Sequence, residues 1–510
     1  MALRIFDYLN ISNFKNLFAD SGFWVQSNLI KYISREIPDV HFYLTIPKGG
    51  KDAIRVAEHF RRIGVKDHVT LVEVPYHAGL LNKVHFDAVA LHEALNVNER
   101  DYDLVLCNEP TLVPSFFELF NHMSHFRIPV ISYMHWIDLP GGGSQVGGNK
   151  TDGNHKLWLL LTGVRWSERA RCNSEFGKRL LTQFTERWLS REQAEKISTQ
   201  FKPLYLGIDT EELDTFGAPY ASRFEVPTIL FNHRISQYTG YDELLDAVRT
   251  LEAEGLKFKV IFTNPAPFHS QTWPKDLKSI EMIEESLSYR DYVCLLHRTH
   301  IVVGLHTGVN QWSLSLPEAA YCGNIPLMTD DTFYPEMFSG IPDNLKKALL
   351  VPRDKFTERL RTLILDADNM RTIIAPQISK YIAERYAWSV RAKEWAAQLR
   401  ESYATIPAWG TDECTHDRIV VLFKEKPILR KSEIVKALSW GTHIKWTSYR
   451  LKLLKDYCID DHRRADTYYE LKKELRTGEY AAQPTLEEKG WFGATKKLLR
   501  RLLKEVSNLD

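Results

Sequence analysis

The stretch Trp312–Phe338 reads WSLSLPEAAYCGNIPLMTDDTFYPEMF, and its order of elements decides the fold. A polar turn precedes an expected helix, Leu314–Tyr321, which Cys322-Gly323 ends because glycine readily adopts the left-handed conformation of a helix stop. The apolar run Ile325–Met328 then predicts a buried strand. The succession of turn, helix and strand is typical of a β/α unit in a parallel sheet.

The same alternation of short apolar runs and amphipathic stretches extends from residue 1 to about residue 400, with a loop-rich connector at Gly207–Pro227. It predicts an α/β fold of parallel sheets covered by helices, and it is too long for one doubly wound sheet, so we expect two. Helices are expected at Tyr241–Glu254 and at Ser389–Leu399, the second of which should return to the first domain. The expected strands are Ala2–Phe6, Val40–Thr45, Val69–Val74, Leu104–Cys107, Val130–Tyr133, Arg171–Asn173, Ile229–Phe231, Lys259–Thr263, Ile301–Gly304 and Ile325–Met328.

Composition excludes several classes of protein. With 44% hydrophobic and 26% charged residues among 510, the chain is not disordered throughout, and a net charge of +1 excludes a histone-like protein. Six scattered cysteines without a CxxC pair indicate reduced thiols rather than a zinc site. The first residues do not resemble a signal peptide, and the longest apolar run, Leu157–Val164, is too short for a membrane span. We expect a cytoplasmic protein, in the host cytoplasm if the source is viral.

Within the opening stretch, Glu318, the Cys-Gly stop, Pro326 and the pair Pro335-Glu336 occur in register. This pattern resembles the nucleotide-sugar motif of retaining GT-B glycosyltransferases of family four, LEA-x-x-CG-x-P followed by PE. The resemblance implies a GT-B fold, with an acceptor domain at 1–205 and a donor domain at 206–405, two Rossmann-like domains facing a cleft. It also implies a hexosyl- or pentosyltransferase that retains anomeric configuration and requires no metal or other cofactor.

The resemblance assigns donor-binding residues. Glu318 would hold the ribose hydroxyls, since a carboxylate accepts hydrogen bonds from both vicinal hydroxyls at once. Backbone N–H groups around Ser313 and Ser315 would hold the diphosphate. The first Glu of the family's E-x7-E pattern falls at Asn310, which carries no charge. The alternative for Glu318 is an ordinary surface position on a β/α unit.

A second element, Phe231-Asn232-His233-Arg234 before Gly240, resembles the family's phosphate-binding segment. Arg234 would clamp the donor phosphates with its planar guanidinium and meet the leaving charge. The family's lysine is replaced by Thr239, and His233 or Lys178 would compensate for the missing charge. A surface arginine at a strand end is the alternative for Arg234.

On the acceptor side, Ile131–Pro140 reads ISYMHWIDLP and places His135 just after an apolar strand, with Asp138 three residues on. Open α/β sheets bind ligands at that edge. The segment resembles the tRNA-queuosine mannosyltransferase-like branch, which implies that His135 contacts the transferred sugar or its leaving oxygen. A structural histidine is the alternative. Glu109 is a further candidate for the cleft, and Arg171–Phe176 and Leu206–Asp209 resemble family segments that border it.

Residues 411–510 form a basic module, with 21 Lys and Arg against 16 Asp and Glu. Two short apolar stripes around Gly441 in Leu429–Leu454 predict a helix-turn-helix, and Tyr457–Leu471 predicts a two-stranded wing. The module at 411–485 therefore resembles a winged-helix domain, which binds either nucleic acid or protein. In the tail 486–510, the pattern of Trp491–Val506 predicts a basic amphipathic helix. It would dock on the protein body, contact nucleic-acid phosphates or lie on a membrane. The candidate DNA contacts are Lys445, Arg450, Lys452, Arg463 and Arg464, with Thr447 and Ser448 between them.

A sugar-transfer body fused to a DNA-binding module resembles bacteriophage DNA glycosyltransferases, which modify hydroxymethylated bases. In that interpretation the Gly-rich loop Gly141–Gly148, with Asn149, Lys150 and His155, would hold a base flipped out of duplex DNA. Three alternatives stay open: a lipid or polysaccharide acceptor at a membrane, queuosine tRNA, and a non-catalytic DNA-binding sensor of nucleotide-sugars. The sugar, the nucleotide, the acceptor atom and the oligomeric state are not specified by the sequence.

Overall fold

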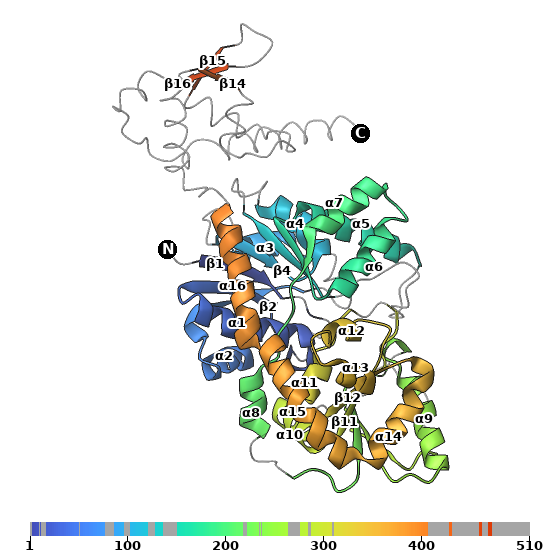
Figure 1. Cartoon of the computed structure of the whole chain (residues 1–510). Helices are drawn as coiled ribbons and strands as arrows, with labels where there is room; N and C mark the ends of the chain where they lie inside the picture. Colours follow the sequence, from blue (N-terminus) through green and yellow to red (C-terminus); the bar gives the residue numbers. More distant parts are fainter. Residues whose placement is uncertain are drawn as a thin grey trace, which may run out of the picture. The chain divides into compact units, whose positions relative to one another are not determined.

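The chain divides into two compact units, unit 1 (Met1–Ile406) and unit 2 (Pro407–Asp510), in the computed structural model (Figure 1). The next paragraphs describe each unit by itself. The structure describes residues 3–9, 11, 17–49, 52–76, 86–95, 102–120, 128–135, 150–217, 222–233, 235, 237–263, 276–283, 287–308, 311–405, 428–430, 458–461 and 468–471.

The first domain of unit 1 is built on a parallel seven-stranded sheet with the order β3-β2-β1-β4-β5-β6-β7. The central strands are mostly buried, as expected of a parallel sheet with helices on both faces, whereas Thr70 and Glu73 on one edge strand and Lys202 on the other are exposed. The strands are β1 (Leu3–Tyr8), β2 (Val40–Pro47), β3 (Val69–Val74), β4 (Leu104–Cys107), β5 (Val130–Met134), β6 (Arg169–Cys172) and β7 (Phe201–Pro203). The helices are α1 (Ser21–Glu36), α2 (Asp52–Arg62), α3 (Ala88–Leu95), α4 (Val113–Glu118), α5 (Lys150–Trp166), α6 (Glu175–Thr185) and α7 (Arg191–Gln200), with 3-10 turns η1 (Leu17–Ala19), η2 (Lys66–His68) and η5 (Pro110–Leu112).

The second domain has a parallel six-stranded sheet with the order β10-β9-β8-β11-β12-β13. The strands are β8 (Thr228–Phe231), β9 (Lys259–Phe262), β10 (Ile280–Met282), β11 (Ile301–Gly304), β12 (Ile325–Thr329) and β13 (Leu350–Val351). The helices are α8 (Thr210–Gly217), α9 (Tyr241–Ala253), α10 (Tyr289–Arg298), α11 (Ser315–Tyr321), α12 (Tyr334–Met337), α13 (Asp343–Leu349), α14 (Phe356–Leu365) and α15 (Ala367–Tyr386), with turns η7 (Gln237–Thr239) and η8 (Arg353–Lys355).

Two separate sheets confirm the central prediction for the fold. The stop after α11 is also as expected: Gly323 has a φ of 87°, which an L side chain rarely adopts. Among the described strands of unit 1, three were not predicted, namely β7, β10 and β13. Each has two or three residues, too few to show an apolar run or an alternation.

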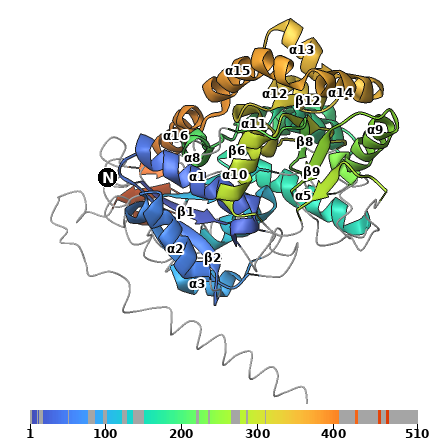
Figure 2. The same ribbon diagram turned by 90° about the horizontal axis from the view of Figure 1, so that it is seen from below.

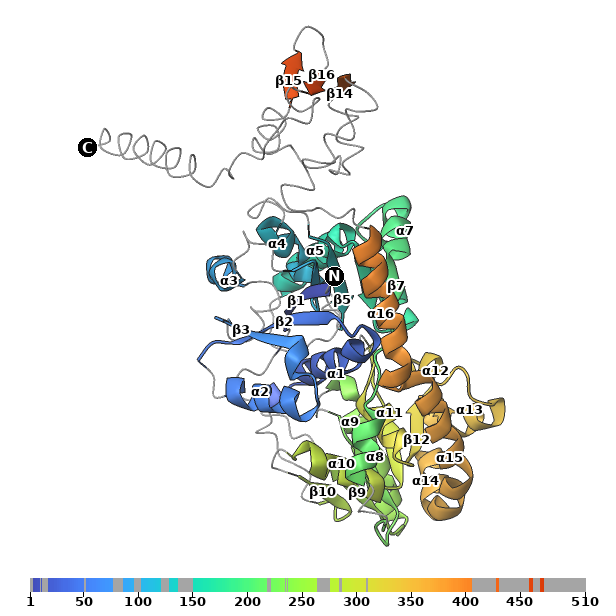
Figure 3. The same ribbon diagram turned by 90° about the vertical axis from the view of Figure 1, so that its left-hand side faces the viewer.

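Helix α16 (Trp388–Thr405) leaves the second domain and returns to the first, where it lies beside α1 (Figures 1 and 3). Trp388 and Trp395 are buried in the same hydrophobic core as the residues of α1 and of the first sheet. The Trp395 indole N–H donates to the Tyr205 carbonyl oxygen at 3.2 Å. The predicted return of Ser389–Leu399 to the first domain is therefore confirmed.

The start of α8 lies beside α1 (Figure 2), and ion pairs join the two elements. Lys31 and Tyr32 of α1 hold the fully buried carboxylate of Asp209, at 2.6 Å and 2.8 Å. Arg35 pairs with Glu211 at 2.6 Å. These contacts fix the segment that connects the two domains against the first domain.

Unit 2 contains a three-stranded antiparallel sheet with the order β14-β16-β15, from β14 (Ile428–Arg430), β15 (Cys458–Asp461) and β16 (Tyr468–Leu471). The pair β15–β16 lies within the predicted wing. Strand β14 includes Leu429 and Arg430, which the sequence had suggested as the start of the helix-turn-helix stretch. The residues expected to form the two helices lie outside the described part of the chain.

Candidate functional site

The carboxyl ends of β8 and β11 bring a chain of polar side chains to the expected donor side. Asn232 follows β8, and its amide N–H₂ donates to the Tyr292 hydroxyl at 3.0 Å and to the Ser315 carbonyl at 2.8 Å. The Tyr292 hydroxyl in turn donates to Glu318 Oε2 at 3.0 Å. Glu318 thus has one oxygen held by Tyr292, and within the described ranges its Oε1 accepts no hydrogen bond, so it can accept from a diol.

The environment of Glu318 changes its acidity. The carboxyl group is largely buried beside tyrosines of α10, and this burial raises its pKa to about 7, against the lowering effect of the Tyr292 hydrogen bond. An ionised carboxylate that is removed from water is destabilised unless new hydrogen-bond donors replace the lost water molecules. Two ligand hydroxyls would supply such donors.

His233 does not supply the positive charge expected of it. Its Nε2–H donates to the Val303 carbonyl at 3.1 Å, which assigns Nδ1 as the acceptor from the Ser315 hydroxyl at 3.0 Å. Burial lowers the pKa of His233 to about 4, so the ring is neutral at physiological pH. The other proposed replacement, Lys178, lies 3.9 Å from the carboxylate of Glu175 on the same helix.

The Ser315 hydroxyl also lies 3.2 Å from that of Ser313, whose oxygen accepts the Leu316 N–H at 3.4 Å. The structure therefore joins His233, Ser315 and Ser313 in one hydrogen-bonded row at the start of α11. Thr239, the replacement for the family's lysine, is buried in η7.

On the first domain, the carboxyl ends of β1, β4 and β5 meet in a buried polar network that the sequence did not predict. The Asn108 amide N–H₂ donates to Gln26 Oε1 at 2.5 Å and to Asp7 Oδ1 at 3.4 Å, and Gln26 donates to the other Asp7 oxygen. His135 Nε2 lies 3.3 Å from Asn108 Oδ1. Burial raises the pKa of Asp7 well above its usual range. His135 is thus connected to a carboxyl group through one amide.

The two sides of the candidate site meet at Asn173–Phe176. Asn173 Nδ2 donates to the His135 carbonyl at 3.0 Å, and the Ser174 hydroxyl donates to the Gln311 carbonyl at 2.8 Å. Gln311 lies just before Trp312 and Ser313, in the loop that enters α11. One segment of the first domain therefore contacts both the His135 strand end and the α11 loop.

Gln311 is itself unusual. Its side chain is fully buried, and within the part of the chain that the structure describes neither Oε1 nor Nε2 has a hydrogen-bond partner. Asn232 Oδ1 and Thr332 Oγ1 are buried and unpaired in the same sense. Unpaired buried polar atoms are costly, and a ligand that supplied hydrogen bonds to them would remove that cost.

The remaining predicted residues are placed as follows. Lys150 begins α5, in which His155 also lies, and Glu109 is buried just before η5. Arg234, Asp138 and Asn310 lie outside the described residues, as do Gly141–Gly148, Asn149, Lys445, Thr447, Ser448, Arg450, Lys452, Arg463 and Arg464.

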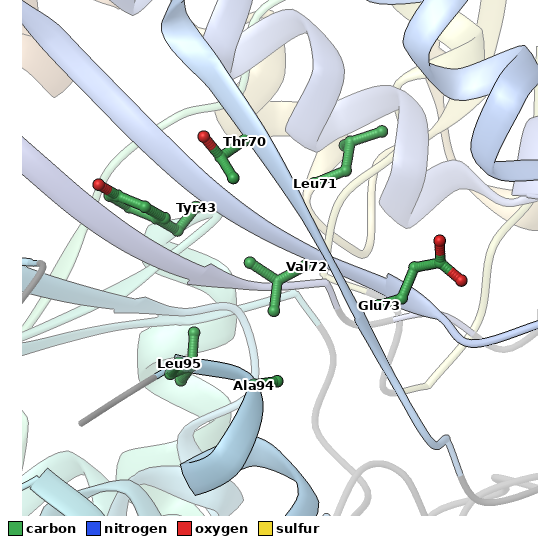
Figure 4. A pocket seen from close by; sticks show the side chains of 7 residues that line it. All are labelled: Tyr43, Thr70, Leu71, Val72, Glu73, Ala94 and Leu95. Carbon is green, nitrogen blue, oxygen red and sulfur yellow. The ribbon is translucent and has the colours of Figure 1, made fainter.

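Two searches of the described residues had negative results. No helix there is both long and apolar enough to cross a membrane, and no three histidine, cysteine or carboxylate side chains in those ranges gather as potential metal ligands. A cavity of about 340 Å³ lies at the edge strand β3 and is lined by Tyr43, Thr70, Leu71, Val72, Glu73, Ala94 and Leu95 (Figure 4). None of the predicted site residues lines it.

No family model matches the sequence, and no curated protein is detectably similar to it. Solved structures, however, have a similar fold. HepE of Anabaena in complex with UDP-glucose is 15% identical and has a TM-score of 0.53, over 78% of this chain and 100% of the other. The catalytic domain of starch synthase IV from Arabidopsis thaliana, bound to ADP and acarbose, is 10% identical with a TM-score of 0.54, over 79% and 99% of the two chains.

A UDP-forming trehalose-phosphate synthase from Burkholderia vietnamiensis is 11% identical with a TM-score of 0.55, over 81% of this chain and 99% of the other. These three matches extend over nearly the whole of the solved chains. In this chain, unit 1 holds two separate parallel sheets, each with its own strand order. The chain therefore has the GT-B fold, with two Rossmann-like domains, that its sequence motifs predicted.

Proposed function

We propose that the protein is a glycosyltransferase that moves a sugar from a nucleotide-sugar donor to a hydroxymethylated or similarly modified base in DNA. The observation that carries the transferase assignment is the setting of Glu318. Its carboxyl group is held by Tyr292 at the carboxyl edge of the second sheet, at the motif position that implies ribose binding. The GT-B fold supports this assignment, since its solved examples include complexes with UDP-glucose and with ADP.

The reaction follows from the donor chemistry. An acceptor hydroxyl oxygen bonds to the anomeric carbon, the bond from that carbon to the diphosphate breaks, and the hydroxyl proton leaves with the diphosphate or to solvent. The proposal includes transfer with retention and without a metal ion, on the strength of the motif resemblance. Arg234 and backbone N–H groups near Ser313 and Ser315 would meet the charge that develops on the diphosphate. His135 would contact the transferred sugar or its leaving oxygen, with Asp138 nearby.

The DNA acceptor rests on the charge of the C-terminal module. Residues 411–510 carry a net charge of +5, from 21 basic and 16 acidic residues, although the whole chain carries only +1. The antiparallel pair β15–β16 in this module supports the predicted wing. In the sequence, Arg463 and Arg464 lie between these two strands. Cations of this kind bind phosphates irrespective of sequence, which suits an enzyme that modifies many sites in one genome.

The test is a product assay with the full chain. UDP- and GDP-sugars are offered with duplex DNA that contains 5-hydroxymethylcytosine, and the nucleosides are then examined by mass spectrometry. We expect a hexose or pentose mass added to the modified base, and loss of that product in Glu318→Ala and Arg234→Ala. Sugar transfer to tRNA, lipid or polysaccharide but not to DNA would refute the acceptor. Absence of donor turnover with every acceptor would refute the transferase.

A second experiment isolates the module. Replacing Lys445, Arg450 and Lys452 together by alanine should weaken DNA binding and flatten its salt dependence by about three charges. Donor hydrolysis, which needs no DNA, should stay at the rate of the unaltered protein. Unchanged DNA affinity in the triple variant would show that this segment does not bind the acceptor. Chelator treatment that abolishes turnover would contradict the metal-independent mechanism.

A further inference from the structure

The first backbone N–H groups of helix α6 donate hydrogen bonds to a residue of the other domain. The first N–H groups of any α-helix have no partner within the helix. In α6, the N–H of Glu175 donates to Glu336 Oε1 at 2.7 Å, and that of Phe176 donates to Glu336 Oε2 at 2.8 Å. Glu336 belongs to α12 of the second domain, 160 residues further along the chain.

The third N–H group of α6 finds its hydrogen-bond acceptor within its own segment. The Ser174 hydroxyl oxygen accepts from the Gly177 N–H at 2.9 Å, as an N-cap does. Glu336 therefore does not replace a missing cap but adds to one. A carboxylate across the first turn also interacts favourably with the positive end of the helix dipole. The Tyr205 hydroxyl donates to Glu336 Oε1 at 2.7 Å as a third donor.

The residues just before this turn contact both sides of the candidate site. Asn173 holds the backbone carbonyl of His135, and the Ser174 hydroxyl holds the backbone carbonyl of Gln311. Gln311 also packs its amide against Gly177, where an added Cβ would lie 2.8 Å from Gln311 Oε1. Displacing the first turn of α6 would therefore move the His135 strand end relative to the loop that enters α11.

We infer that Glu336 is a positioning residue, which holds the acceptor side and the donor side of the site in register by clamping the first turn of α6. The expected effect of Glu336 on sugar transfer rests on the proposed function, whereas its expected effect on the position of α6 does not. Glu318, the proposed ribose-binding group, is held instead by the Tyr292 hydroxyl, which in turn accepts a hydrogen bond from the Asn232 amide, within the second domain. Loss of Glu336 should therefore affect transfer much more than nucleotide binding.

Glu336→Gln is the informative variant. The single oxygen of the new amide still accepts one backbone N–H, but the NH₂ group faces the other backbone N–H, and two donors cannot bond. Glu254→Gln is the matched control, because Glu254 also makes a two-point contact, with Arg361, but entirely within the second domain. Both changes remove one negative charge and add no volume.

The structural test measures hydrogen–deuterium exchange in the full chain without ligand. In Glu336→Gln we expect faster exchange of the Glu175 and Phe176 amides, and also of peptides that contain His135 and Gln311. Glu254→Gln should leave all of these unchanged. Faster exchange confined to the first turn of α6 would overturn the inference, because Glu336 would then be a helix cap only. This readout is independent of whether the protein transfers sugar.

The functional test compares kcat for transfer with KM for the donor, using UDP-glucose and hydroxymethylated duplex DNA, together with UDP binding by calorimetry. We expect kcat to fall roughly 10- to 100-fold in Glu336→Gln, the loss typical of a reacting pair displaced by about an ångström. KM for UDP-glucose and the Kd for UDP should change less than twofold. Equal loss of kcat and of UDP affinity, or no loss of kcat, would overturn the positioning role. If the unaltered protein transfers no sugar, the proposed function fails and the exchange experiment alone decides.

Discussion

Replacing Glu318 by glutamine should stabilise the free protein in alkaline solution. Burial raises the pKa of this carboxyl from 4.5 to about 7, so the folded state binds a proton that the unfolded state releases between those values. The folded protein therefore loses stability as the pH rises from 4.5 to 7, and the full penalty is present above pH 7. Glutamine carries no such penalty, and its Oε1 still accepts from the Tyr292 hydroxyl.

The magnitude follows from the pKa values. A carboxyl pKa raised from 4.5 to about 7 makes ionisation about 3 kcal/mol less favourable in the folded state. The glutamine variant should thus be more stable by about 3 kcal/mol at pH 8, and by less than about 1 kcal/mol at pH 5. Urea unfolding at the two pH values measures the difference. Glu254→Gln should show no gain at pH 8, because its Arg361 partner lowers the pKa of Glu254.

Nucleotide binding provides the functional counterpart. The diol of a ribose donates best to an ionised carboxylate, so the advantage of UDP over a 2′,3′-dideoxy analogue should grow between pH 6 and pH 8. Comparing the two ligands cancels the titration of the phosphates. Glu318→Gln should lose this growth. A stability difference that does not change with pH would show that Glu318 is not held in a water-poor environment, and the reasoning would fail.

Three further perturbations test single features of the fold. Gln311→Leu removes an amide whose polar atoms lack partners in the described structure, so the free energy of unfolding should rise by about 1–3 kcal/mol in urea. A loss of stability would show that the amide is satisfied. Gly207→Ala would place a Cβ 2.7 Å from the Trp388 backbone, and it should lower stability by about 1–3 kcal/mol in the same assay. Lys31→Met leaves the buried carboxylate of Asp209 without its cation and should cost about 3–5 kcal/mol; a smaller cost would mean that water reaches the pair.

The sequence predicted the two sheets because short apolar runs that alternate with amphipathic stretches are a local signal. The strands that it missed, such as Leu350–Val351, are short and depend on a neighbouring strand for their definition. The return of Ser389–Leu399 was predicted because this stretch is amphipathic and because the terminal helices of the GT-B family that the motifs resemble return in this way. The helices of the C-terminal module stay predictions.

The candidate site was predicted only where a motif marked it. Glu318 was found in this way, whereas Tyr292, which holds it, lies 26 residues away and has no motif of its own. Asp7 and Asn108 could have been suspected, since each is a polar residue at the end of a buried strand. Glu336 was noted within the motif, but its contact with α6 joins residues that no local pattern relates.

The return of α16 has a consequence for the synthesis of the chain. The core of the first domain includes Trp388, Trp395 and Leu399, which are translated after the whole of the second domain. The first domain therefore stays incomplete on the ribosome, with the surface of Tyr32 that Trp388 covers still open to water or chaperones. The core of the second domain ends at Tyr386 and includes no residue of α16. The second domain should therefore finish folding first, although it is synthesised second.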